Sequence, residues 1–142
     1  CDIVVANEKA SFIQAFSKIG LVPDSAGSFF LPRLIGFQKA SALMLLGDKV
    51  SAAQAQDLGM IYKVFPPETF HQEVHSLALH MAQLPTKALG LTKKLLNASF
   101  NNTLEQQLAL ESKLQIQAAN SNDYKEGVSA FVEKRKPNFK GN

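Results

Sequence analysis

The chain has 142 residues, 46% of them hydrophobic, and its 15 Lys and Arg against 12 Asp and Glu give a net charge of +3. This composition provides enough apolar side chains for one globular core. It excludes a disulfide scaffold, a collagen-like repeat and an intrinsically disordered tail. A charge this small does not indicate a nucleic-acid protein, so we expect no nucleic-acid partner.

The single cysteine, Cys1, allows no disulfide within the chain, which favours a reducing compartment, the cytoplasm. No apolar run approaches the roughly 20 residues that span a bilayer, so we expect no membrane association. The chain starts without Met, inside an apolar β-branched segment, and we interpret it as a fragment of a longer polypeptide. A lipoprotein anchored through Cys1 is the alternative, but the flexible linker that normally follows such an anchor is missing.

The elements predicted in chain order begin with strands at residues 1–6 and 10–12, where apolar and β-branched residues flank a polar turn. Another strand is predicted at 60–65. Ser51 predicts a helix start, because Gln54 completes a capping box. The first predicted helix has its apolar face on residues 29–35 and ends at Gly36. The other helices are predicted at residues 38–46, 51–59, 68–84, 86–97, 103–120 and 121–134.

Asp24 lies after Pro23 in the loop before the first helix, and two roles are open to it. It is either an N-cap, accepting hydrogen bonds from the first helical turn, or a general base in an apolar setting. Phe16, Leu21 and Phe29 are close in sequence, and desolvation among such residues would raise the pKa of a carboxyl group.

Other familiar motifs are weak or absent. His71 and His75 have the spacing of metal ligands on a helix, but no third ligand has a matching spacing. We therefore expect a polar surface stripe there and no metal. The glycines match neither a dinucleotide fingerprint nor a P-loop, and no serine lies in a nucleophile elbow.

Residues 131–140 carry four cations and two phenylalanines. Such a set can hold a phosphate and stack a base. Alternatively, it is a solvated helix end, where basic side chains favour the negative pole of the helix dipole. The residues are Phe131, Lys134, Arg135, Lys136, Phe139 and Lys140.

Several segments, in their order and spacing, resemble the crotonase (enoyl-CoA hydratase/isomerase) superfamily. They are CDIVVA at residues 1–6, GLVPD at 20–24, LPRLIG at 31–36 and EGVSAFVEKR at 126–135. The resemblance covers the whole chain and matches the C-terminal part of a family subunit. It implies an α/β fold of the crotonase/ClpP-like spiral type, here as short strands followed by a mainly helical C-terminal region.

The resemblance also implies a division of roles along the chain. Residues 1–66 would belong to the crotonase core and carry the Asp24 loop. Residues 67–142 would form a helical region that contacts CoA and other subunits. Family members assemble as trimers or dimers of trimers, so we expect a homo-trimer or hexamer, with residues 103–134 supplying the surface.

Within the superfamily, the segments at residues 15–21 and 123–127 are most similar to the isomerases of bacterial phenylacetate degradation. These enzymes convert 1,2-epoxyphenylacetyl-CoA to an oxepin-CoA and shift enoyl-CoA double bonds. The similarity implies that Asp24 is the acid/base of a CoA-thioester isomerase, with an oxyanion hole supplied upstream of Cys1. Phe16 stands where hydratases carry one of their two catalytic glutamates.

The substrate pocket implied by this similarity includes Phe16, Leu21 and Pro23. At the far end of the substrate, Phe131 and Lys134 would hold the adenine and 3′-phosphate of CoA, in many relatives across a subunit boundary. CoA would be part of the substrate, so no separate cofactor is expected.

One departure from the family lies beside Asp24: this chain has Ala26 and Gly27 where relatives carry two glycines, and a methyl group at Ala26 could shift the turn that aims Asp24. Two other functions stay open. The first is an enoyl-CoA hydratase. The second is a non-catalytic acyl-CoA-binding or assembly module, because the oxyanion-hole donors are not in this sequence.

Overall fold

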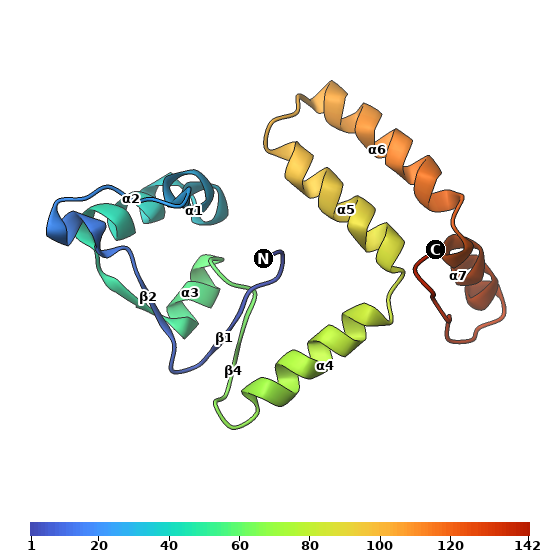
Figure 1. Cartoon of the computed structure of the whole chain (residues 1–142), viewed down its shortest axis with the longest axis horizontal. Coiled ribbons are helices and arrows are strands. Elements are labelled where there is room, and N and C mark those ends of the chain that lie inside the picture. Colours follow the sequence, from blue (N-terminus) through green and yellow to red (C-terminus); the bar gives the residue numbers. More distant parts are fainter. The chain divides into compact units, whose positions relative to one another are not determined.

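The computed structural model describes all residues, 1–142, as two compact units, unit 1 (Cys1–Val74) and unit 2 (His75–Asn142) (Figure 1). Short strands alternate with helices in unit 1, whereas unit 2 is helical, as the predicted fold class requires. The elements are β1 Val5–Asn7, β2 Ser11–Ile13, the 3₁₀ helix η1 Ala15–Ile19, α1 Gly27–Ile35, α2 Phe37–Leu46, β3 Lys49–Ser51, α3 Ala52–Leu58, β4 Lys63–Phe65, α4 Phe70–Ala82, α5 Thr86–Ser99, α6 Leu104–Ala119 and α7 Asn122–Val132.

Two short ladders connect the strands of unit 1. β1 pairs with β4 in parallel, with Ala6 opposite Val64, and β2 pairs with β3 antiparallel. The strands predicted at residues 1–6 and 60–65 are present, but they are shorter than predicted. β3 was not predicted, because Lys49–Ser51 is too short to show an alternating pattern.

Glycines end the helices of unit 1 where the sequence predicts. Gly36 separates α1 from α2 with a φ of +81°, and Gly47 ends α2 with a φ of +66°. Both values lie in the range that side chains disfavour and glycine tolerates. The two helices pack through a buried cluster of Leu31, Ile35 and Ala40.

The predicted capping box at the start of α3 is confirmed. The Ser51 hydroxyl accepts the Gln54 N–H at 3.2 Å, and the Gln54 side-chain oxygen accepts the Ser51 N–H at 3.0 Å. The helix ends at Gly59, again as predicted. Its buried side joins a second core cluster, made of Ala6, Val50, Ala52, Ala55 and Ile61.

Unit 2 contains the end of α4, then α5, α6, α7 and a C-terminal tail of residues 133–142. α5 and α6 lie side by side and antiparallel (Figure 1). A capping box between Thr103 and Gln106 starts α6. The helices predicted between residues 68 and 134 are all present, and their ends differ from the prediction by less than one turn.

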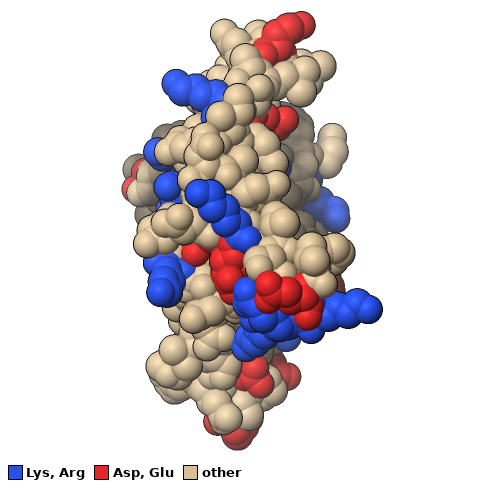
Figure 2. All heavy atoms as spheres, turned by 90° about the vertical axis from the view of Figure 1, so that its right-hand side faces the viewer, with Lys and Arg blue, Asp and Glu red and all other residues tan.

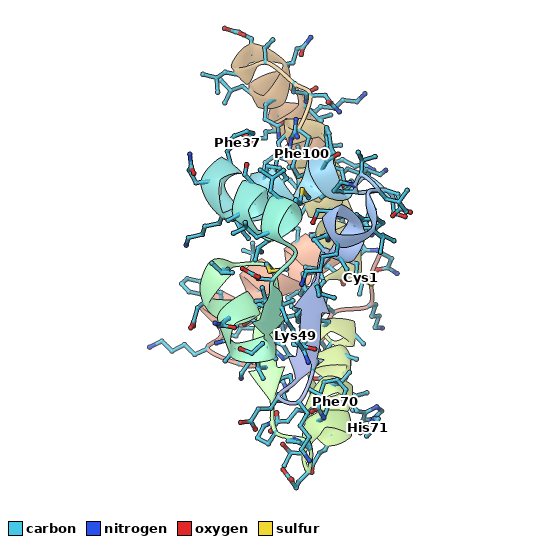
Figure 3. All side chains as sticks on the ribbon, turned by 90° about the vertical axis from the view of Figure 1, so that its left-hand side faces the viewer. Cys1, Phe37, Lys49, Phe70, His71 and Phe100 are labelled. Atoms are coloured by element: carbon cyan, nitrogen blue, oxygen red, sulfur yellow. The ribbon has the colours of Figure 1, made fainter.

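Large apolar side chains are exposed in both units. Val22 is 80% exposed, and Phe37 in the first turn of α2 is 75% exposed (Figure 3). No helix has both the length and the apolar composition needed to cross a membrane.

Candidate functional site

The loop that carries Asp24 is closed at both ends by backbone hydrogen bonds. The Leu21 N–H donates to the Phe16 carbonyl at 2.9 Å, at the end of η1. The Gly27 N–H donates to the Asp24 carbonyl at 2.8 Å, at the start of α1. The main chain of the loop therefore fixes where Asp24 lies.

Two non-glycine residues after Asp24 adopt a left-handed conformation, Ser25 with a φ of +48° and Ala26 with a φ of +59°. Each such residue costs on the order of 1 kcal/mol or more, and strained residues of this kind collect at functional sites. The Ala26 that departs from the family pattern thus takes the conformation that glycine prefers.

The Asp24 carboxylate is exposed, and it neither accepts a hydrogen bond nor forms an ion pair. The alternative that Asp24 caps α1 is wrong. The N-cap residue is Ala26, and no side chain caps the helix, because Asp24 comes too early to reach the N–H groups of its first turn. The carboxylate is thus left available for a ligand.

The residues predicted to line a pocket around Asp24 lie in the same stretch of unit 1. Phe16 in η1 and Pro23 in the loop are half-buried, whereas Leu21 is 58% exposed. Because Leu21 and Asp24 are both exposed in this chain, these neighbours alone do not supply the apolar setting that would desolvate the carboxylate. The roles of these residues stay predictions.

Unit 1 also contains a cavity of about 370 Å³ that the sequence did not reveal. Gln14, just before η1, lines it, and the Gln14 side-chain oxygen is buried without a hydrogen-bond partner. An unpaired buried amide oxygen is unfavourable. A lone Gln between the apolar pairs Phe12–Ile13 and Ala15–Phe16 was the only sequence signal for this position.

The second predicted part of the site is the turn after α7. Phe131 is 85% exposed, and Lys134 has a φ of +55°. The Lys134 N–H donates to the Phe131 carbonyl at 3.3 Å, and the Arg135 N–H donates to the Ala130 carbonyl at 3.0 Å. This is the pattern of a helix C-cap whose left-handed residue is usually glycine, and here that residue is Lys134.

Arg135 is at the centre of an ion-pair network on this turn. Its guanidinium donates to both Glu126 oxygens, at 2.6 and 2.9 Å, and to Glu133 at 2.6 Å. The Arg135 hydrogen bond, followed by that of the Asn138 N–H, lowers the pKa of Glu126 from 4.5 to about 2. Hydrogen bonds from Arg135 and then Ser129 lower the pKa of Glu133. Acidic and basic atoms lie in contact on the face of the molecule in Figure 2.

This network occupies Arg135, one of the four cations near the C-terminal end of the chain. Two carboxylates compensate its charge, whereas the Lys134 and Lys136 side chains have no acidic partner. The four cations are therefore not equivalent, because Arg135 is the one held in ion pairs with carboxylate groups. An anion at this turn would be bound by lysine side chains.

A largely apolar cavity of about 390 Å³ lies beside this turn, within unit 2, and was not predicted. Phe131 and Phe139 line it, with Val128 of α7. The Phe139 ring packs on Gly127, where an added Cβ would lie 3.5 Å from the ring. The tail thus folds back against α7 through an aromatic contact.

His71 and His75 both lie on α4, with His71 in its first turn. The His71 ring lies edge-on to the Phe70 ring, with 5.6 Å between their centroids (Figure 3). No group of three or more His, Cys, Asp or Glu side chains comes together to hold a metal ion.

The family model for enoyl-CoA hydratase/isomerase matches residues 1–142, the whole chain. The chain belongs to the enoyl-CoA hydratase/isomerase family. It is 49% identical over 140 residues to the 1,2-epoxyphenylacetyl-CoA isomerase of Escherichia coli K12, covering 99% of this chain and 53% of that protein. It is 40% identical over 140 residues to the mitochondrial enoyl-CoA hydratase of Pongo abelii, covering 99% and 48%.

The fold is similar to solved structures of the same family. A crystal structure of an enoyl-CoA hydratase subunit I from Geobacillus kaustophilus superposes with a TM-score of 0.95 at 34% sequence identity. The match covers 100% of this chain and 55% of that one. The crotonase fold is thus confirmed. The chain spans about half the length of the relatives it matches.

Proposed function

We propose that this chain is the part of an acyl-CoA isomerase that carries its acid/base residue, Asp24. The observation that carries the proposal is an exposed carboxylate without a partner, on a turn whose main chain fixes its position. The 49% identity to a 1,2-epoxyphenylacetyl-CoA isomerase supports the choice of substrate. The reaction would be the conversion of that epoxide to an oxepin-CoA, or a double-bond shift in an enoyl-CoA.

For the double-bond shift, the proposed chemistry is a proton transfer within the substrate. The Asp24 carboxylate would take a proton from a carbon of the acyl chain, and the electron pair left behind would delocalise onto the thioester oxygen as an enolate. Two N–H donors of an oxyanion hole, supplied upstream of Cys1, would stabilise that oxygen. Asp24 would then return the proton to a different carbon.

Phe16 separates this proposal from its nearest rival, an enoyl-CoA hydratase. A hydratase must bind and activate water, and a phenylalanine at this position can do neither. In the complete site, the aromatic ring of Phe16 would also help to exclude water. The rival remains relevant because relatives named as hydratases are 40% identical to this chain.

At the other end of the substrate, we assign the adenine of CoA to Phe131 and its 3′-phosphate to Lys134. The Phe131 ring is exposed and available for stacking, and Lys134 has no acidic partner. The proposal includes action in the cytoplasm and assembly into a homo-trimer or hexamer through residues 103–134.

The deciding experiment compares D24N with wild type in the complete enzyme. We expect D24N to lower kcat by on the order of 10²–10⁴-fold, with acyl-CoA affinity nearly unchanged. Asp57 on α3 is also an exposed carboxylate, so D57N is the matched control and should keep wild-type turnover. Isomerisation that survives in D24N would refute the assignment.

A second assay separates the isomerase from its alternatives. Wild-type enzyme given an enoyl-CoA in ¹⁸O-labelled water should yield isomerised product without label. Labelled hydroxyacyl-CoA would identify a hydratase. Acyl-CoA binding with no turnover of either kind would favour a non-catalytic binding or assembly module.

A further inference from the structure

Lys134 adopts a backbone conformation that its side chain disfavours. Its φ of +55° places it in the left-handed region, where Cβ crowds the following carbonyl oxygen. Glycine is the usual residue at this point of a helix C-cap. A strained non-glycine residue persists only where the surrounding structure holds it, and such strain is found at ligand contacts.

Contacts on both sides hold Lys134 in this conformation. Glu133, just before it, accepts hydrogen bonds from the Ser129 hydroxyl at 2.8 Å and from the Arg135 guanidinium at 2.6 Å. Arg135, just after it, donates its N–H to the Ala130 carbonyl at 3.0 Å. The residues flanking Lys134 are thus tied to α7 and to each other.

Glu126 on α7 fixes the same turn from further along the chain. Its carboxylate accepts both terminal N–H groups of Arg135, and it also accepts the Asn138 N–H at 2.8 Å. The segment with Lys134 and Lys136 therefore lies between two anchored points. Because Arg135 is occupied by two carboxylates, it is not available to a phosphate, whereas Lys134 is.

We infer that Arg135 and Glu126 are positioning residues that hold the strained turn at Lys134, so that its ammonium group meets the 3′-phosphate of CoA. This inference rests on the proposed contact between Lys134 and CoA, and it deepens that proposal. Neither positioning residue touches the ligand. They act through the backbone of the turn.

The direction in which the affinity for a phosphate changes distinguishes a positioning role of Glu126 from a purely electrostatic one. Replacing Glu126 by Gln removes a negative charge that now compensates Arg135, so Coulomb attraction alone would strengthen the binding of a phosphate. Loss of positioning would weaken it. The variant E8Q makes the same charge change at an exposed residue of unit 1 that takes no part in the network, and it is the matched control.

The experiment measures the affinity of the complete enzyme for CoA and for 3′-dephospho-CoA by calorimetry. A phosphate bound by a charge-assisted hydrogen bond should make wild type prefer CoA by about tenfold. The variants E126Q, R135K and K134G should each lose most of this preference, while E8Q keeps it. K134G should lose it without loss of thermal stability, because glycine fits the left-handed turn.

The outcomes distinguish the two proposals. If wild type shows no preference, or K134G keeps it, the contact between Lys134 and CoA is wrong, and the positioning role falls with it. If K134G loses the preference but E126Q and R135K keep or increase it, only the positioning role is overturned. Equal weakening of both ligands would indicate a purely structural role and also overturn it. Thermal unfolding identifies folded variants, and R135K decides if E126Q does not fold.

Discussion

The buried carboxylate of Asp123 accepts the backbone N–H of Lys140 at 2.7 Å. Its second oxygen accepts the Gly141 N–H at 2.8 Å. In return, the N–H groups of Asn122 and Asp123 donate to the backbone oxygen of Asn142, at 2.9 and 3.2 Å. These four hydrogen bonds therefore connect the first turn of α7 to residues 140–142.

We expect D123N to destabilise unit 2 by about 1–3 kcal/mol, because an amide NH₂ would then face an N–H donor that has no acceptor. Urea unfolding measures the change, with the exposed D57N of unit 1 as control. The tail should also become a better substrate for carboxypeptidase. Unchanged stability together with unchanged cleavage would contradict the role of Asp123.

The left-handed turn beside Asp24 predicts opposite effects of two substitutions in one loop. A26G should raise the free energy of unfolding by up to about 1 kcal/mol, because glycine adopts the φ of +59° without strain. G20A should lower it by about 1 kcal/mol: its φ is +73°, and no atom lies within 4 Å of an added Cβ, so only conformation is affected. Chemical denaturation checks both, and changes of the same sign would refute the argument.

The capping box of α3 predicts a ranking at Ser51. S51A should lower the free energy of unfolding by about 1 kcal/mol, because the Gln54 N–H loses its acceptor. S51G should cost only a few tenths of a kcal/mol, since glycine tolerates the N-cap conformation. Thermal unfolding of the two variants tests the order. An S51G less stable than S51A would show that the capping hydrogen bond is not what matters there.

The network at Arg135 predicts a pH dependence. The pKa of Glu126 falls from 4.5 to about 2 on folding, so the folded state favours the ionised carboxylate. Its contribution to stability is complete above pH 4.5 and is lost as the pH falls toward 2. The difference in Tm between wild type and E126Q should therefore shrink across that interval. A difference independent of pH would exclude this contribution, and E8Q provides the baseline.

Local features of this fold could be predicted from the sequence. The capping box at Ser51 and the stops at Gly36, Gly47 and Gly59 need only residues within one or two turns, so the helices were predicted closely. The family could also be inferred, because the segments that carry the resemblance are short and contiguous in the sequence. The alternative that Asp24 caps α1 is wrong because the cap position depends on the left-handed turn at Ser25, which the residue types alone do not predict.

Features that depend on distant partners could not be predicted. β3 becomes a strand only because β2 lies beside it, and its own three residues carry no pattern. Arg135 was counted as one cation among four, because the sequence does not show that Glu126 comes within hydrogen-bond distance. The cavities lined by Gln14 and by Phe139 likewise arise from packing between separate elements.

The two ladders of unit 1 also affect how the chain folds. Ala6 pairs with Val64, and Phe12 pairs with Val50. Nearly all of unit 1 therefore lies within the chain segments that separate these partners. The α5–α6 hairpin brings together neighbours in the chain, and local contacts of this kind form sooner than long-range ones. The helices of unit 2 are therefore expected to form in an early kinetic phase. Until the strands of unit 1 are paired, they can associate with another chain. The slow pairing of these strands is therefore the folding step that a chaperone would have to protect.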